Sequence, residues 1–256
     1  MCVHLVKIKV LNNIDKNSNL KNILIACEES QVVCNAFRAK GYEAYSCDII
    51  ECSGGHPEWH IKGDVLPLLN GKCAFETMDG ATHKIDKEWD LIIAHPPCTD
   101  LAVSGARHFE KKRLNGNQEK SIRFFASILA AECTRLAVEN PIGIISGDYI
   151  KKWFPEIAEQ FNFPIKPTQI IQPYEYGHPV RKSTCLWLKN LPPLQPTNIV
   201  DFECIHSKGK SGGYSGNLWV AKDENGKILS YNDPRTARIR SRTYEGIAQA
   251  MADQWG

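Results

Sequence analysis

The chain has 256 residues, of which 43% are hydrophobic and 23% are charged, and its formal net charge is +2. These values are ordinary for one globular α/β domain with a sizeable core, and the charge does not indicate a strong nucleic-acid binder, although it leaves room for local basic patches. No apolar run approaches the length of a membrane span, so we expect no membrane partner. Ten cysteines without a signal peptide predict a reducing, cytoplasmic setting instead of a disulfide framework.

The hydrophobic pattern predicts strands that alternate with helices. In chain order it predicts an edge strand at 3–10, a core strand at 22–27, a helix at 31–40, a strand at 42–49, a strand tip or turn at 63–65, a hairpin within 70–88 and a strand at 89–94. It then predicts an amphipathic helix at 118–133, strands at 136–138, 170–173 and 184–188, and a closing helix at 244–255. This alternation implies an α/β domain over residues 1–256, with a doubly wound, mostly parallel sheet and a small loop-rich insertion at 191–236.

Four residues have a spacing that superficially resembles a zinc site. Cys47, Cys52, His56 and His60 follow the pattern C-x4-C-x3-H-x3-H. However, Cys47 ends a predicted strand, and the glycine-containing loop after it need not close on an ion. We therefore predict no metal centre.

Cys98 is the leading candidate for chemistry. It lies in the run A-H-P-P-C-T-D-L-A-V-S-G at 94–105, directly after an apolar segment that predicts a buried strand. Pro96 and Pro97 fix the backbone, so the thiol is expected where a strand of the sheet opens into a loop. Open parallel sheets bind their ligands at such loops.

A second predicted strand ends in a carboxylate, in the sequence A-V-E-N-P at 137–141. A thiolate from Cys98 and a carboxyl from Glu139 are the groups that attack on C6 of a pyrimidine would use. The thiolate adds to the ring, and the carboxyl near N3 stabilises the charge that develops there. The pair therefore indicates covalent chemistry on a pyrimidine.

Several segments match, in order, the motifs of one known family. They are residues 27–41 with Ala36-Phe37 and Gly41 at their end, Asp48, Gly63-Asp64-Val65, Pro96-Pro97-Cys98 with Gly105 and Arg107, Glu139-Asn140, Tyr176-Gly177-His178-Pro179, and residues 246–252. Taken together, the chain resembles the DNA (cytosine-5) methyltransferase family, and its small phage-encoded members in particular, over nearly its whole length.

The resemblance implies a Rossmann-like, class I methyltransferase-like fold and methyl transfer from S-adenosylmethionine to C5 of cytosine in DNA. It implies catalytic roles for Cys98, Glu139, Asn140, Arg181 and Lys182. It implies cofactor contacts from Ala26, Cys27, Glu28, Asp48, Ile49, Asp64, Val65, His95 and Pro96. Ser104, Arg107, Lys210 and Arg240 are the candidates for nucleic-acid contacts.

The chain departs from the family pattern around the cofactor and the nucleophile. The family's glycine-rich first turn is replaced by E-E-S-Q-V at 28–32. The glutamine after the catalytic cysteine is replaced by Thr99, and Asp100 follows. A carboxylate there would raise the pKa of the thiol unless a cation such as Arg107 or His95 offsets it.

Two later departures concern recognition of the substrate. The family's Q-x-R becomes V-R-K at 180–182, where Lys182 keeps the register of the arginine. Residues 191–236 stand where the family carries a much larger target-recognition domain. Their lysines, glycines and aromatic residues, with the arginines that follow, suit contact with a phosphate backbone and stacking on a base.

Two other functions stay open. An enzyme of the same fold that acts on a free pyrimidine nucleotide, or uses another donor, would explain the short recognition segment and the altered first turn. A binding protein with a remade cofactor pocket would explain Glu28 and Glu29, but it would need neither Cys98 nor Glu139. The sequence does not indicate the target sequence or the oligomeric state.

Overall fold

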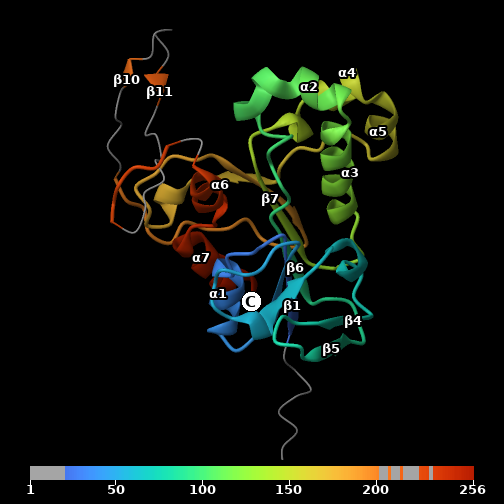
Figure 1. Ribbon diagram of the computed structural model, residues 1–256, viewed down its shortest axis with the longest axis vertical. Helices are drawn as coiled ribbons and strands as arrows, with labels where there is room; N and C mark the ends of the chain where they lie inside the picture. The colour runs from blue at the N-terminus through green and yellow to red at the C-terminus, as the bar shows by residue number, and fades with distance from the viewer. Residues whose placement is uncertain (1–20, 202–206, 209–213, 216–224, 231–232) are drawn as a thin grey trace, which may run out of the picture.

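The computed structural model describes residues 21–201, 207–208, 214–215, 225–230 and 233–256 (Figure 1). The predicted edge strand at 3–10 and the candidate residue Lys210 lie outside these ranges.

Seven strands form one mixed sheet in the order β3-β2-β1-β6-β7-β9-β8. They are β1 (Asn22–Ala26), β2 (Glu43–Asp48), β3 (His60–Lys62), β6 (Leu91–Ala94), β7 (Leu136–Pro141), β8 (Gln169–Ile171) and β9 (Thr184–Lys189). The pairs among β3, β2, β1, β6 and β7 are parallel, whereas β9 runs antiparallel to both of its neighbours. The predicted α/β fold with a mostly parallel sheet is therefore confirmed, and the arrangement is compatible with a Rossmann-like fold.

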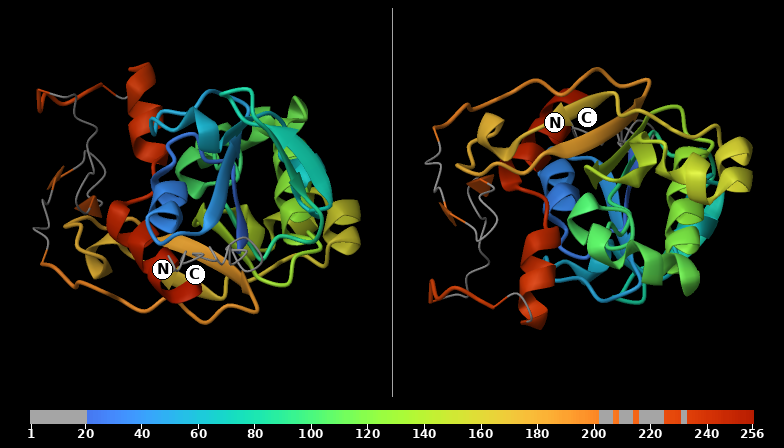
Figure 2. Two further views of the ribbon diagram at one scale, coloured as in Figure 1. Left: turned by 90° about the horizontal axis from the view of Figure 1, so that it is seen from below. Right: turned by 90° about the horizontal axis from the view of Figure 1, so that it is seen from above.

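Helices cover both faces of the sheet (Figures 1 and 2). One face packs against α1 (Val32–Arg38) and α7 (Glu245–Trp255), and the other against α3 (Asn117–Leu129), α4 (Tyr149–Trp153) and α5 (Pro155–Gln160). The remaining elements are the helices α2 (Phe109–Leu114) and α6 (Pro234–Ser241), the hairpin of β4 (Cys73–Glu76) and β5 (Thr82–Ile85), and the strand pair β10 (Ser207–Lys208) and β11 (Tyr214–Ser215). The hairpin predicted within 70–88 is thus confirmed.

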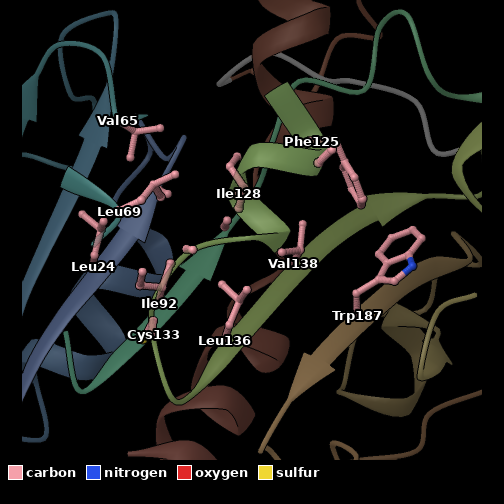
Figure 3. Packing of buried hydrophobic residues seen from close by; sticks show 14 of the residues in the cluster. Leu24, Val65, Leu69, Ile92, Phe125, Ile128, Cys133, Leu136, Val138 and Trp187 are labelled. Atoms are coloured by element: carbon pink, nitrogen blue, oxygen red, sulfur yellow. The ribbon is translucent and has the colours of Figure 1, made fainter. Parts of the chain in front are cut away.

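The alternation of side chains along the central strands builds a core on each face. In β1, Ile23 and Ile25 face α1 and α7, whereas Leu24 packs into the core beneath α3. Figure 3 shows the second of these cores, where Leu24 and Ile92 lie near the α3 residue Ile128. Full burial of each such side chain contributes about 1.5–3 kcal/mol, so the two cores hold the central strand ends rigidly in place.

Strand β7 is longer than the predicted strand at 136–138, because it continues to Pro141. The parallel neighbour β6 pairs only with residues 136–138, but the antiparallel neighbour β9 pairs with β7 as far as Pro141. Glu139 therefore lies within a paired strand, opposite Leu186, instead of at a free tip. A residue held by a strand has a better defined position than one in a loop.

The order of the strands reverses between β1 and β6. After β1 the chain adds β2 and β3 on one side and then returns to place β6 on the other side of β1. The connections that leave the carboxyl ends of β1 and β6 therefore run in opposite directions, and ligands of open α/β sheets bind at such a point.

In the described residues, no helix has the length and apolar character needed to cross a membrane.

Candidate active site

The β1–α1 turn keeps left-handed backbone positions although it has no glycine. Cys27 and Gln31 have φ angles of 60° and 58°, a region that side chains other than glycine rarely adopt. Gln31 is fully buried, and its amide donates to the carbonyl of His56 at 2.8 Å and accepts from the His56 amide at 3.1 Å. The loop after β2 thereby clamps the turn and compensates for the missing glycines.

Glu28 caps the first helix. Its carboxylate accepts hydrogen bonds from the amides of Val33 at 2.6 Å and Cys34 at 3.1 Å, and the residue is only 4% exposed. Burial raises the pKa of Glu28, while His95 and the two amides act in the opposite direction. The resemblance implies a cofactor contact for Glu28, but these bonds direct its carboxylate into α1.

Glu29 fastens α6 to the same turn. Arg238 donates two hydrogen bonds of 3.0 Å to its two carboxylate oxygens, and Ser53 donates a third of 2.5 Å. Partial burial raises the pKa of Glu29, but the bonds from Arg238 and Ser53 outweigh this effect and hold the pKa below its usual range. The second unexpected carboxylate of the turn therefore also has a partner within the protein.

The ends of β1, β2 and β3 bring together Cys27, Asp48 and Asp64. Burial raises the pKa of the Cys27 thiol strongly, and the negative charges of both aspartates add to the effect. Asp48 is held through its Oδ1, which accepts from the Ile50 amide at 3.2 Å, and the exposed side chain of Ile49 lies beside it in sequence. Asp64 is exposed and accepts from the Leu66 amide at 3.0 Å, which starts a turn.

Three of the residues predicted to contact a cofactor are buried in or beside the strand ends. The side chains of Ala26 and Val65 belong to the core, and they are 0% and 4% exposed. Pro96 is buried as well. Their contribution to a ligand site is therefore one of shape.

The residues with zinc-like spacing are engaged in other contacts. Both ring nitrogens of His60 have partners, the Ser46 hydroxyl at 2.8 Å and the Ile50 carbonyl at 2.9 Å. His56 contacts Glu58 through Nδ1 at 2.9 Å. Within the part of the chain that the structure describes, no group of three or more His, Cys, Asp or Glu side chains is arranged to hold a metal ion.

The Cys98 loop folds into a tight turn after β6. The carbonyl of Cys98 accepts from the amides of Leu101 at 3.0 Å and Ala102 at 2.9 Å. The neighbouring Asp100 forms an ion pair of 3.3 Å with Lys112 of α2, which also donates to the carbonyl of Thr99. The cation that offsets Asp100 is therefore Lys112, whereas the sequence suggested Arg107 or His95.

Glu139 and Lys182 act in opposite directions on the Cys98 thiol. Burial raises the pKa of Cys98, the charge of Glu139 raises it further, and Lys182 and Lys112 lower it. The thiol is thus neutral at pH 7, and a substrate that neutralises Glu139 would favour the thiolate. Of the two basic residues predicted here, Lys182 is therefore brought to Cys98, whereas Arg181 is exposed.

Two hydrogen bonds join β7 to the loop after β6. Asn140 donates from Nδ2 to the carbonyl of Pro96 at 2.7 Å, and Nδ1 of His95 lies 3.3 Å from Oε2 of Glu139. Two buried polar atoms at this place have no hydrogen-bond partner, Nε2 of His95 and Oδ1 of Asn140. Unpartnered buried polar atoms are rare in proteins, because such an atom lacks the hydrogen bond that would offset its desolvation.

Glu139 and Lys182 line a cleft whose other wall is the link between α6 and α7. The residues of that wall include Ser241, Arg242, Thr243 and Tyr244, and of these the sequence pointed only to Arg242, as one of the arginines that follow the insertion. Lys182 donates to the carbonyl of Arg240 at 3.0 Å, and its Nζ lies 5.8 Å from the centre of the Tyr244 ring. Only tertiary contact identifies this link, because its sequence carries no motif of its own.

The residues predicted to contact nucleic acid come from different elements. Ser104 and Arg107 are exposed in the 3-10 turn Val103–His108 after the Cys98 loop, and Arg107 donates to His108 at 2.9 Å. Arg240 is exposed on α6. Both segments border the candidate site, since one follows Cys98 and the other contacts Lys182.

Comparison with known proteins adds no assignment to this geometry. No protein-family model matches the chain, and no curated protein sequence matches it significantly.

Proposed function

We propose that this protein transfers a methyl group from S-adenosylmethionine to C5 of cytosine in DNA, through a covalent adduct at Cys98. The observation that carries the proposal is the proximity of Cys98, Glu139 and Lys182. They lie near the point between β1 and β6 where the strand order reverses. Glu139 and Lys182 are close enough to change the pKa of the thiol, and both also line one cleft. A nucleophile, an acid for N3 and a cation are the groups that the addition requires.

Residues at the end of β2 present groups that fit the cofactor. The half-buried carboxylate of Asp48 and the exposed side chain of Ile49 present a polar and an apolar surface, which suit a ribose and an adenine ring. The unpartnered Nε2 of His95 belongs to the same loop after β6 that carries Cys98. When bound, the cofactor would supply an electrophilic methyl group on a sulfonium; Asp48 and Asp64 would hold its ribose and adenine.

The protein's own residues would perform the addition to the base. The Cys98 thiol gives its proton to the Glu139 carboxylate, Sγ of the thiolate forms a bond to C6, the C5–C6 double bond opens, and the proton passes from the Glu139 carboxyl to N3. Lys182 stabilises the thiolate before the attack, and Asn140 holds the loop of Cys98 against β7. A cytosine in duplex DNA must first be turned out of the helix, which costs a few kcal/mol.

The structure of the first turn weakens the argument for a binding protein. That hypothesis depended on Glu28 and Glu29, and both carboxylates have partners inside the protein. Action on a free pyrimidine nucleotide remains the second candidate, because the segment 191–236 is short for a recognition domain. A cytoplasmic setting belongs to the same proposal, since all eight cysteines in the described ranges have free thiols.

Covalent trapping tests the proposal. The protein is incubated with S-adenosylmethionine and duplex DNA that contains 5-fluoro-2′-deoxycytidine, whose fluorine blocks loss of the group at C5. We expect a stable complex, with the modified peptide containing Cys98, and no complex for Cys98→Ser. The control is Cys73→Ser, a half-buried cysteine of the β4–β5 hairpin, which should trap like the wild type.

A second arm replaces the DNA with 5-fluoro-2′-deoxycytidine monophosphate. Trapping of the nucleotide alone would support the second candidate and overturn DNA as the substrate. Absence of any complex in both arms, for a protein that is folded and binds S-adenosylhomocysteine, would overturn nucleophilic attack by Cys98.

A further inference from the structure

His95 stands between two carboxyl groups that come from different elements. Its Nδ1 contacts Oε2 of Glu139 on β7 at 3.3 Å, and it is close enough to Glu28 of the β1–α1 turn to influence the pKa of that carboxyl. The side chain is only 9% exposed. An imidazole enclosed in this way has little freedom to choose another partner.

The backbone of His95 fixes this placement. Its amide donates to the carbonyl of Ala26 at 2.9 Å, which ties the end of β6 to the end of β1. On the other side, the bond from Asn140 to the Pro96 carbonyl ties the next residue to β7. The ring is therefore held at one distance from Glu139 by contacts to both neighbouring strands.

We propose that His95 is a positioning residue for Glu139, and that it holds the carboxyl so that one oxygen faces the substrate ring. This inference rests on the proposed function. Nδ1–H donates to Oε2, and Oε1 remains for N3 of the pyrimidine.

The proton balance follows from this arrangement. When Cys98 adds to C6, the proton of the Glu139 carboxyl passes to N3, and the resulting carboxylate keeps the hydrogen bond from Nδ1–H of His95. When the Sγ–C6 bond breaks, the proton returns from N3 to Glu139. His95 keeps its own proton throughout, and the hydrogen that the methyl group replaces at C5 leaves as a proton to water before the Sγ–C6 bond breaks.

Ionisable groups from several elements surround the pair of His95 and Glu139. Glu28 faces His95 from the β1–α1 turn, while Cys98 and Cys185 face Glu139 from the β6 loop and β9. Lys182 lines the same cleft as Glu139.

Two variants separate positioning from simple packing. His95→Ala removes the donor, and we expect kcat to fall about 10- to 100-fold with little change in KM. His95→Asn places an amide donor near the position of Nδ1, so it should restore much of the rate. His83→Asn, in the β4–β5 hairpin, is the control and should keep the wild-type rate.

A measurement that needs no activity tests the pair itself. With 15N-labelled histidine, the ring nitrogens of the eight histidines are recorded by NMR against pH, and His95 is assigned from the spectrum of His95→Asn. We expect the Nδ1–H tautomer in the wild type, and a changed tautomer balance or titration in Glu139→Gln. This result stands even if the protein methylates nothing, in which case only the proposed function fails.

The opposite results would overturn the inference alone. They are an unchanged His95 signal in Glu139→Gln, or equal rates for His95→Ala and His95→Asn in an enzyme that traps 5-fluorocytosine.

Discussion

Asn140 of β7 donates a hydrogen bond of 2.7 Å to the carbonyl of Pro96, and this bond fixes the loop of Cys98 to the strand that carries Glu139. The two residues are 44 positions apart in the chain. Glu139 precedes Asn140, and Cys98 follows Pro96 by two residues. The bond therefore restrains the distance between the Glu139 carboxyl and the Cys98 thiol. The chemistry proposed for the protein depends on this connection.

Removal of the Asn140 amide should loosen the nucleophile loop. In Asn140→Ala the buried Pro96 carbonyl loses its partner, and we expect a loss of about 1–3 kcal/mol in the free energy of unfolding. Trapping of 5-fluorocytosine should slow at the same time. Urea denaturation measures the first effect, with the exposed Asn70→Ala as a control that should change stability by less than about 0.5 kcal/mol. Equal stability of the two variants would contradict the structural role of Asn140.

The reactivity of Cys98 should follow the charges around it. Alkylation by iodoacetamide needs the thiolate, and burial and Glu139 raise the pKa of the thiol while Lys182 lowers it. At pH 8 we therefore expect several-fold faster alkylation in Glu139→Gln and several-fold slower alkylation in Lys182→Met than in the wild type. Mass spectrometry of the Cys98 peptide over a range of pH measures the rates. Identical rates in all three proteins would show that neither residue acts on the thiol.

The link between Glu29 and Arg238 should stabilise the protein only when Glu29 is ionised. The pKa of Glu29 lies below its ordinary value of 4.5, so the stabilisation is present above that value and is lost as the pH falls through the lower, folded-state pKa. Arg238→Met should lower the free energy of unfolding by about 1 kcal/mol at pH 7. The difference from the wild type should shrink below pH 4.5. A difference that is the same at acid and neutral pH would mean that packing, and not charge, is lost.

Cofactor binding should depend on Asp48. If its carboxylate holds the ribose hydroxyls, Asp48→Asn should weaken S-adenosylhomocysteine binding about tenfold or more, the equivalent of a charged hydrogen bond of about 1.5–3 kcal/mol. Isothermal titration calorimetry of the purified protein measures this affinity. Asp86→Asn, at the exposed end of the β4–β5 hairpin, should bind like the wild type. Undetectable binding to the folded wild-type protein would exclude this cofactor.

The sequence by itself determined the layers of the fold. Apolar runs such as 22–27 and 89–94 indicated buried strands, the spacing of Ile122, Phe125 and Leu129 indicated a helix, and both signals are local. The helices α2, α4 and α5 were not predicted, because five or six residues carry too little periodicity. The strand-end position of Cys98 also followed from local pattern, since prolines directly after a buried strand end it.

Only the tertiary structure decided which side chains meet. The antiparallel partner β9 extends β7 past Glu139, and it is the fold that brings His95 to Glu139, Lys112 to Asp100 and the α6–α7 link to Lys182. These pairs join residues far apart in the chain, and hydrogen bonds across a sheet leave no periodic trace in sequence. The carboxylates of the first turn show this most clearly: from sequence they suggested a changed ligand pocket, whereas their bonds to α1 and Arg238 make them part of the scaffold.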